Sequence, residues 1–275
     1  MRDEASRTAM GSAVLRAAHV RQDPPPWILE DTLSERLLSD TERRTILAEI
    51  ASWPPDVAAA FRRSHAARTR LAEDVAVGGI AAGRPRYVML GAGLDSFAWR
   101  HPHAGALEVV EIDHPATQEW KRRRLAQLGL ETPPNLCFVP VDLARSALPS
   151  RELGAPATWS WLGVTMYLGP GTVKEVLHRI GGAPEGTTLV VNFLLAEEDL
   201  GGSARIVRAT SQRTVQRAGE PIRSTYTRRG CEDVLTGAGF GSVEVLDSES
   251  LAARYRSIRP ELQLPATTLV AVARV

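Results

Sequence analysis

Residues 86–100 read RYVMLGAGLDSFAWR, and this stretch decides the fold class. The apolar run from Tyr87 to Leu90 ends at Gly91-Ala92-Gly93, a pattern typical of a buried strand that leads into a helix. Glycine at such a turn permits a tight bend and a close approach of the backbone to a ligand. Because the motif is short, its meaning depends on the sequence on either side of it.

Similar apolar runs follow at residues 107–112, 136–141, 159–164 and 189–195. Their near-continuous apolar character predicts parallel strands that are covered on both faces. Helical patterns lie between them at 115–128 and 172–180, the second with an expected capping box formed by Thr172 and Glu175. With a helix at 228–237 and two last strands at 243–246 and 267–275, the prediction is an α/β fold with seven strands.

The chain before residue 86 has a different, helical pattern. We predict helices over 5–20, over 40–50 with Asp40 as its cap, and from about 56 to 78. These give a helical N-terminal cap over residues 1–80 and a core domain over 81–275. Within the core, a helix over 199–218 and the loop after it form an insertion at about 197–226, behind the fifth strand, where it can cover a substrate.

Composition and charge exclude several classes of function. Hydrophobic residues make up 44% of the chain and charged residues 24%, as in an ordinary globular protein. The net charge of +1 leaves no global field for nucleic acid or an anionic membrane. The two cysteines are isolated, so we expect neither a disulfide framework nor a metal site. No apolar run suggests a signal peptide, so the expected location is cytoplasmic.

Acidic residues stand at the ends of two predicted strands. Asp113, with Glu111 close before it, ends the second strand, and Asp142 follows the third. Ligands of open α/β sheets bind beyond the carboxyl ends of the strands, where Asp113 could meet ribose hydroxyls and Asp142 an adenine amino group. Each acid taken alone is also compatible with a solvated helix cap. Together they favour an adenosine-containing ligand.

A dinucleotide such as NAD fits the glycine turn poorly. Its fingerprint calls for a third small residue near position 96, and here Ser96 is followed by the bulky Phe97. Asp95 would repel a pyrophosphate, and we find no Tyr-x-x-x-Lys pair for a proton relay. An NAD-linked oxidoreductase is therefore the weaker alternative.

Several blocks of sequence together resemble the leucine carboxyl methyltransferase family of S-adenosylmethionine-dependent enzymes. The blocks are Arg68-Thr69-Arg70, residues 90–100, Glu111-Ile112-Asp113-His114-Pro115, Lys121-Arg122, Val141-Asp142-Leu143 and residues 163–168 (GVTMYL). The resemblance implies a seven-stranded, Rossmann-like class I methyltransferase fold with S-adenosylmethionine as cofactor. It also implies that Arg68 pairs with the methionine carboxylate, that Gly91, Ala92 and Gly93 line the cofactor, that Asp113 binds the ribose, and that Asp142 and Leu143 contact the adenine. One departure is Leu162, where the family often has Glu.

The resemblance predicts O-methyl transfer, first to a carboxylate of a small molecule or a peptide C-terminus. Methylation of a hydroxyl group on a polyketide-like natural product is the alternative, and Leu162 motivates a third one, a cofactor-binding protein without turnover. A sulfonium methyl is already activated, so positioning supplies most of the catalysis and a dedicated base is optional. Arginines in the insertion could hold an acidic acceptor or form a solvated helix face. The expected substrate contacts are Arg223, Tyr226, Tyr167 and Tyr255; the sequence does not predict the oligomeric state.

Overall fold

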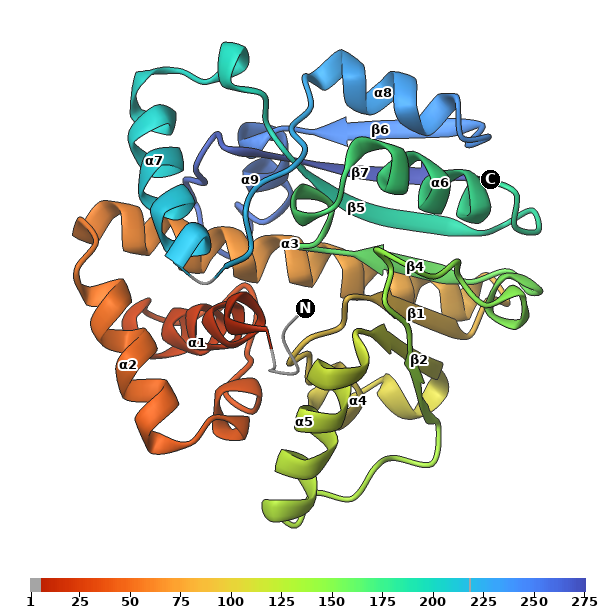
Figure 1. Cartoon of the computed structure of the whole chain (residues 1–275), viewed down its shortest axis with the longest axis horizontal. Coiled ribbons are helices and arrows are strands. Elements are labelled where there is room, and N and C mark those ends of the chain that lie inside the picture. The colour runs from red at the N-terminus through yellow and green to blue at the C-terminus, as the bar shows by residue number, and fades with distance from the viewer. Residues whose placement is uncertain (1–5, 218) are drawn as a thin grey trace.

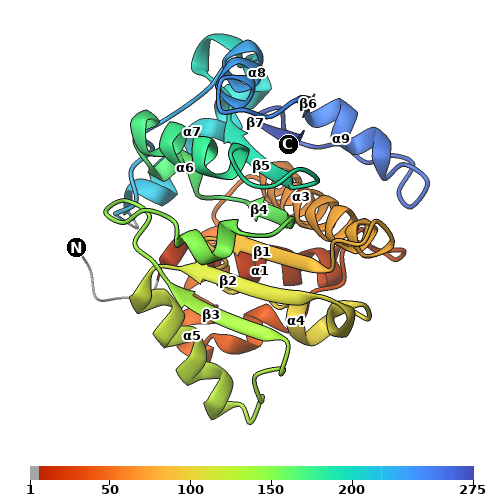
Figure 2. The same cartoon turned by 90° about the vertical axis from the view of Figure 1, so that its right-hand side faces the viewer.

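The computed structural model describes residues 6–217 and 219–275, and within them seven strands form one sheet in the order β3-β2-β1-β4-β5-β7-β6 (Figures 1 and 2). The strands are β1 (Arg86–Leu90), β2 (Glu108–Asp113), β3 (Leu136–Pro140), β4 (Thr158–Trp161), β5 (Thr188–Leu194), β6 (Ser242–Leu246) and β7 (Thr268–Arg274). Strand β7 runs antiparallel to both of its neighbours, β5 and β6, and the other pairs are parallel. The predicted α/β class is confirmed.

Helices alternate with these strands along the chain, as the sequence pattern predicts. They are α1 (Arg7–Gln22), α2 (Asp40–Ala51), α3 (Pro55–Ala81), α4 (Phe97–Arg100), α5 (Pro115–Gln127), α6 (Pro170–Gly181), α7 (Gly202–Arg217), α8 (Arg228–Thr236) and α9 (Ser248–Arg254). Strand order reverses between β1 and β4, which are neighbours although β2 and β3 lie between them in sequence. Such a switch point is where open α/β sheets bind ligands.

Successive residues of each central strand pack into different layers. Val88 and Leu90 of β1 belong to the cluster that includes α6 and α8, whereas Tyr87 and Met89 pack in a cluster with Ala76 of α3. Both faces of the sheet are therefore covered, which explains the near-continuous apolar runs. Each large apolar side chain buried in this way contributes about 1.5 to 3 kcal/mol to folding.

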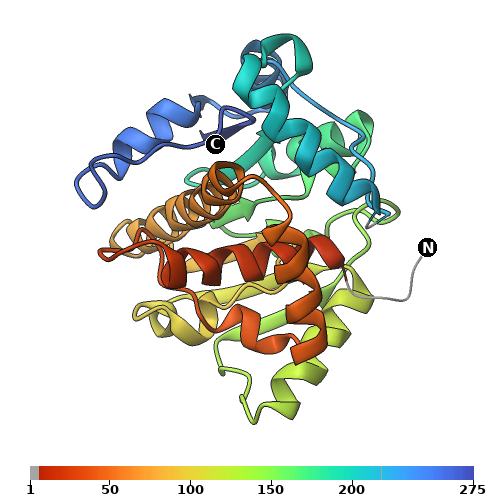
Figure 3. The same ribbon diagram turned by 90° about the vertical axis from the view of Figure 1, so that its left-hand side faces the viewer.

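The three N-terminal helices gather on one side of the molecule, red to orange in Figure 3. The longest of them, α3, packs directly on the sheet, with Ala66 and Leu71 in one cluster with Val190 of β5 and Val270 of β7. Helix α1 packs against α3. The helical N-terminal segment thus shares its core with the sheet through α3.

Several local predictions need correction. Helix α6 begins at Pro170 with Gly169 as its N-cap, so Thr172 lies inside the helix and forms no capping box; proline is preorganised for the first helical position. In α2 the cap is Ser39, which shares a capping box with Glu42. Strand β3 is an edge strand in which Cys137 is exposed, so it is not covered on both faces.

Strand β4 also differs from its prediction, since it stops at Trp161 rather than at residue 164. Gly163 has a φ of +74° and turns the chain away from the sheet. Among residues 6–217 and 219–275, we find no helix that is both long and apolar enough to span a membrane.

Candidate active site

A cavity of about 800 Å³ lies at the carboxyl ends of β1, β2 and β4, at the switch point of the sheet. Its walls come from the segments after these strands, from α1, α2 and α3, and from the end of α7 with the loop that follows. A volume of this size is in the range of small-molecule and cofactor sites. The predicted residues Arg68, Gly91, Ala92, Gly93, Asp113, Asp142, Leu143 and Tyr167 all line it.

The glycine turn after β1 forms part of the cavity floor. Gly91 and Gly93 have φ values of +63° and +53°, a conformation that L side chains rarely adopt. A Cβ on Gly91 would overlap Cγ2 of Val164, and one on Gly93 would lie 3.0 Å from Cβ of Ala9. Glycine is therefore needed at both positions, because Val164 and Ala9 fill the space that a Cβ would take.

A buried ion pair holds the loop that follows this turn in place. Lys121 of α5 is 1% exposed, and its Nζ donates to Oε2 of Glu111 at 2.6 Å and to the carbonyl of Asp95 at 2.7 Å. Glu111, which the sequence places close to Asp113, therefore serves the loop rather than the cavity. The pair fixes residue 95 to β2 and α5.

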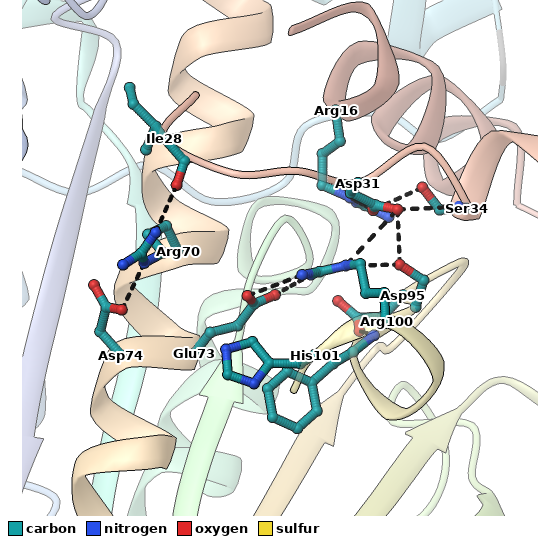
Figure 4. A network of polar contacts seen from close by, with 12 residues as sticks. Arg16, Ile28, Asp31, Ser34, Arg70, Glu73, Asp74, Asp95, Arg100 and His101 are labelled. Atoms are coloured by element: carbon teal, nitrogen blue, oxygen red, sulfur yellow. Dashed lines mark hydrogen bonds and ion pairs between the residues drawn. The ribbon is translucent and has the colours of Figure 1, made fainter. Parts of the chain in front are cut away.

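A second polar network joins the N-terminal segment to the same loop (Figure 4). The buried carboxylate of Asp31 accepts from Arg16 Nε at 2.8 Å, from Ser34 Oγ at 2.8 Å and from Ser96 Oγ at 2.7 Å. Arg16 also donates to the carbonyl of Leu94 at 2.9 Å. Burial alone would raise the pKa of Asp31, but Arg16 and its other donors hold it well below its usual range. The loop over residues 94–96 is thereby tied to α1.

Arg68 of α3 is a buried cation that faces the cavity without a counter-ion. Among the described residues, no acceptor forms a hydrogen bond or ion pair with its guanidinium, and a Cβ on Gly163 would lie 3.1 Å from its Nη2. Burial lowers the pKa of Arg68 to about 10, which leaves it charged at neutral pH. A buried charge needs a partner, so this position calls for an anionic ligand group.

Two carboxylates in the cavity walls belong to Asp113, at the end of β2, and to Asp142, shortly after β3. Asp113 accepts from the backbone N–H of Gly93 and, at 2.6 Å, from that of His114, and burial raises its pKa. Asp142 accepts from Ala144 N at 3.0 Å through Oδ1, whereas its buried Oδ2 has no hydrogen-bond partner among the described residues. Oδ2 lies 3.7 Å from Nε of Arg145 and 3.9 Å from Nε2 of His114, and the side chain of Asp142 forms part of the cavity wall.

The turn after β4 depends on a residue that sequence reasoning left unassigned. Asn192 interrupts the apolar strand β5; its Oδ1 accepts from Gly163 N at 2.5 Å and its carbonyl accepts from Thr165 Oγ1 at 2.7 Å. A buried polar residue in an apolar run signals such a partner. Leu162, just before the turn, lines the cavity with an apolar side chain.

Of the four predicted substrate contacts, only Tyr167 lies in the cavity walls as described. Burial, and then Glu220, raise the pKa of Tyr167 to about 12. Arg223 is exposed, and Tyr226 packs against Phe193 at a ring distance of 4.9 Å.

Tyr255 is buried away from the cavity. Its hydroxyl donates to Oδ2 of Asp74 at 3.1 Å, in the cluster beneath α9. The structure therefore gives no support to substrate contacts by Arg223, Tyr226 or Tyr255.

The insertion arginines have varied settings. Arg208 is buried and donates to the carbonyls of Leu195 and Thr267, at 2.7 and 2.9 Å, so it is structural. Arg205 and Arg213 are exposed. The side chain of Arg217 lies outside the described residues.

The remaining walls were not predicted. They include Thr8 of α1, Trp53 after α2, Phe61 and His65 of α3, and Glu220 after α7. Thr8 Oγ1 donates to Glu220, which joins α1 to the loop behind α7. These residues meet only through tertiary packing, and helical periodicity alone does not show which of them face a cavity.

Comparisons with known proteins identify the family of the chain. The family model described as leucine carboxyl methyltransferase matches residues 9–181. YktD of Bacillus subtilis, placed by its name among the S-adenosyl-L-methionine-dependent methyltransferases, is 28% identical over 94% of either chain. A Mycobacterium marinum protein with a name of the same kind is 29% identical over 94% of this chain and 88% of its own.

Solved structures show the same fold at low sequence identity. A DUF574 family protein from Streptomyces avermitilis matches with a TM-score of 0.57 at 16% identity, over 94% of this chain and 96% of that one. A Thermobifida fusca protein matches with a TM-score of 0.54 at 17% identity, over 96% and 93%.

Proposed function

Since the chain belongs to the leucine carboxyl methyltransferase family, we propose that it transfers the methyl group of S-adenosyl-L-methionine to an oxygen atom of a small molecule bound in the cavity. The observation that carries this proposal is Arg68, a buried cation that faces the cavity and has no counter-ion among the described residues. The methionine part of the cofactor bears the carboxylate that such a cation requires.

The other residues of this half of the cavity fit the same ligand. The backbone at Gly91 and Gly93 lines the cavity, Asp113 is placed to accept from ribose hydroxyls, and Asp142 is placed to accept from the adenine amino group. Leu143 adds an apolar contact for the ring beside Asp142. The carboxylate, the ribose and the adenine of the cofactor thus each have a matching group in the walls.

The main task of the protein in this reaction is to align the acceptor oxygen with the methyl group. When bound, the cofactor supplies a methyl group already activated by its sulfonium. The walls hold the acceptor oxygen in line with that methyl and exclude water, which is worth up to about 7 to 11 kcal/mol of the barrier. This alignment needs rigid walls. The loop over residues 91–96 is held in place because Lys121 donates to the carbonyl of Asp95 and Ser96 donates to Asp31. A natural-product acceptor suits the apolar walls contributed by Ile50 and Trp53.

A matched pair of variants tests the proposal. Arg68→Met removes the buried cation, whereas Arg70→Met changes an arginine of the same helix that pairs with Asp74 and lies outside the cavity walls. Isothermal titration should show S-adenosylmethionine binding weakened about 10- to 150-fold by Arg68→Met, from the roughly 1.5 to 3 kcal/mol of a charged hydrogen bond. Arg70→Met should change it less than threefold. Equal affinities in both variants would contradict the assignment.

A further inference from the structure

The part of the cavity beyond Arg68 has apolar and aromatic walls. Ile46, Ile50 and Trp53 contribute from α2 and the turn after it, and Phe61 contributes from α3, with the rings of Trp53 and Phe61 5.2 Å apart. His65 stands between Phe61 and Arg68 on the cavity-lining side of α3. It precedes Arg68 by about one helical turn, or roughly 4.5 Å along the axis.

The tautomer of His65 is set by its neighbour. Its Nδ1 lies 2.8 Å from the carbonyl oxygen of Phe61, and since a carbonyl only accepts, Nδ1 carries the proton. Nε2, on the other side of the ring, therefore holds a lone pair, and none of the described residues is bonded to it. Burial, and then Arg68 and Arg16, keep the pKa of His65 well below its usual value, so the ring is neutral at pH 7.

The two cations nearest His65, Arg68 and Arg16, are not free to hold an acidic acceptor. Under the proposed function Arg68 is taken by the cofactor carboxylate, and Arg16 is already bonded to Asp31 and to a backbone carbonyl. The third arginine in the described cavity walls is Arg7. It is exposed and is the first residue of α1, nine residues before Arg16.

Acidic groups add to this effect. Glu49 and Glu220 line the cavity, on α2 and after α7, and neither is among the residues assigned to the cofactor. A second carboxylate would meet repulsion here, whereas a neutral hydroxyl group would not.

We propose that His65 accepts the proton of a hydroxyl group, and that the acceptor is a neutral phenol with an apolar skeleton rather than a carboxylate. This rests on the proposed function. The phenol oxygen forms a bond to the methyl carbon as the carbon–sulfur bond breaks and leaves its electron pair on sulfur. The hydroxyl proton, which becomes strongly acidic as the ether forms, passes to Nε2 of His65 and then to water. The products are the methyl ether, S-adenosylhomocysteine and one proton.

Two probes that share a skeleton test the choice of acceptor. Titration of 4-butylphenol and of 4-butylbenzoate into protein saturated with S-adenosylhomocysteine measures affinity without turnover. Methyl transfer from radiolabelled S-adenosylmethionine to each probe measures the reaction. Both are repeated with His65→Gln, whose amide can donate to Phe61 but cannot take up a proton. His178→Gln is the control, since His178 is exposed on α6 and outside the described cavity walls.

The expected result is at least tenfold tighter binding of the phenol than of the benzoate. With His65→Gln, methyl transfer to the phenol should fall by 10² to 10⁴, the range of general-base catalysis, while S-adenosylmethionine affinity changes less than threefold. His178→Gln should match the wild type in every measurement.

Three results would overturn the inference: binding of neither probe, equal or tighter binding of the benzoate, or a rate for His65→Gln within threefold of the wild type. Failure of the proposed function would look different, because the wild type itself would then bind neither S-adenosylmethionine nor S-adenosylhomocysteine.

Discussion

Replacing Asp31 with asparagine should strongly destabilise the fold. The Asp31 side chain is fully buried and accepts from Arg16 at 2.8 Å, from Ser34 at 2.8 and 3.1 Å and from Ser96 at 2.7 Å, with Arg100 Nε 3.8 Å away. Asparagine keeps the volume but removes the negative charge and directs an amide donor at groups that are themselves donors. Breaking a buried ion pair costs about 3 to 5 kcal/mol, which is the expected loss in unfolding free energy.

Urea denaturation measures this loss. With a slope of about 3 kcal/mol per molar urea, the midpoint should fall by about 1 to 2 M. The control is Asp233→Asn, which removes an exposed partner of Arg229 on α8 and should change stability by less than about 0.5 kcal/mol. A midpoint for Asp31→Asn within about 0.3 M of the wild type would refute the stabilising role of the network.

The same comparison has a defined pH dependence. Because the pKa of Asp31 is held below its ordinary value of 3.8, the unfolded chain takes up a proton at this residue before the native state does as the pH falls. The stabilising contribution is therefore complete above that value and is lost as the pH falls below it. The difference between the wild type and Asp31→Asn should be constant from about pH 5 to 8 and should shrink in more acidic solution.

Three other changes have expected outcomes. Gly91→Ala should weaken S-adenosylmethionine binding at least tenfold by titration, because the positive φ and the overlap with Val164 force the turn to move. Lys121→Met should lower the unfolding free energy by about 3 to 5 kcal/mol in urea by leaving Glu111 buried and unpaired, and adding Glu111→Leu should restore at least half of the loss. His65 is neutral when folded but takes up a proton near pH 6.5 when unfolded, so wild-type stability relative to His65→Gln should fall as the pH drops below 6.5 in urea titrations.

The fold was predictable because its signals are local. Each central strand is a short apolar run, and the turn at Gly91 and Gly93 marks the switch from strand to helix within a few residues. Two of the errors concern which of several nearby residues caps or opens a helix. Ser39 rather than Asp40 caps α2, and Pro170 rather than Thr172 opens α6, because several neighbouring residues can serve as a cap and only the backbone conformation selects one.

Some residues of the candidate site could likewise be predicted from local sequence, and others could not. Asp113 ends β2 and Asp142 lies two residues after β3, so the parallel arrangement of these strands brings them to one edge of the sheet. His65 and Glu220, by contrast, reach the cavity only after α3 and the loop behind α7 have packed against other elements. Tyr255 is a different case, because its sequence setting gave no sign that its hydroxyl donates to Asp74 of α3 rather than to a ligand.

The most direct test of the central claim is isothermal titration of the purified protein with S-adenosylmethionine, S-adenosylhomocysteine and NAD in separate experiments. The account predicts micromolar binding of the first two, about −8 kcal/mol, at one site per chain, and no heat of binding with NAD. Binding of NAD would contradict the assignment of Arg68, Asp113 and Asp142 to a methyl donor, and binding of none of the three would make Leu162 the mark of a site that no longer holds its cofactor.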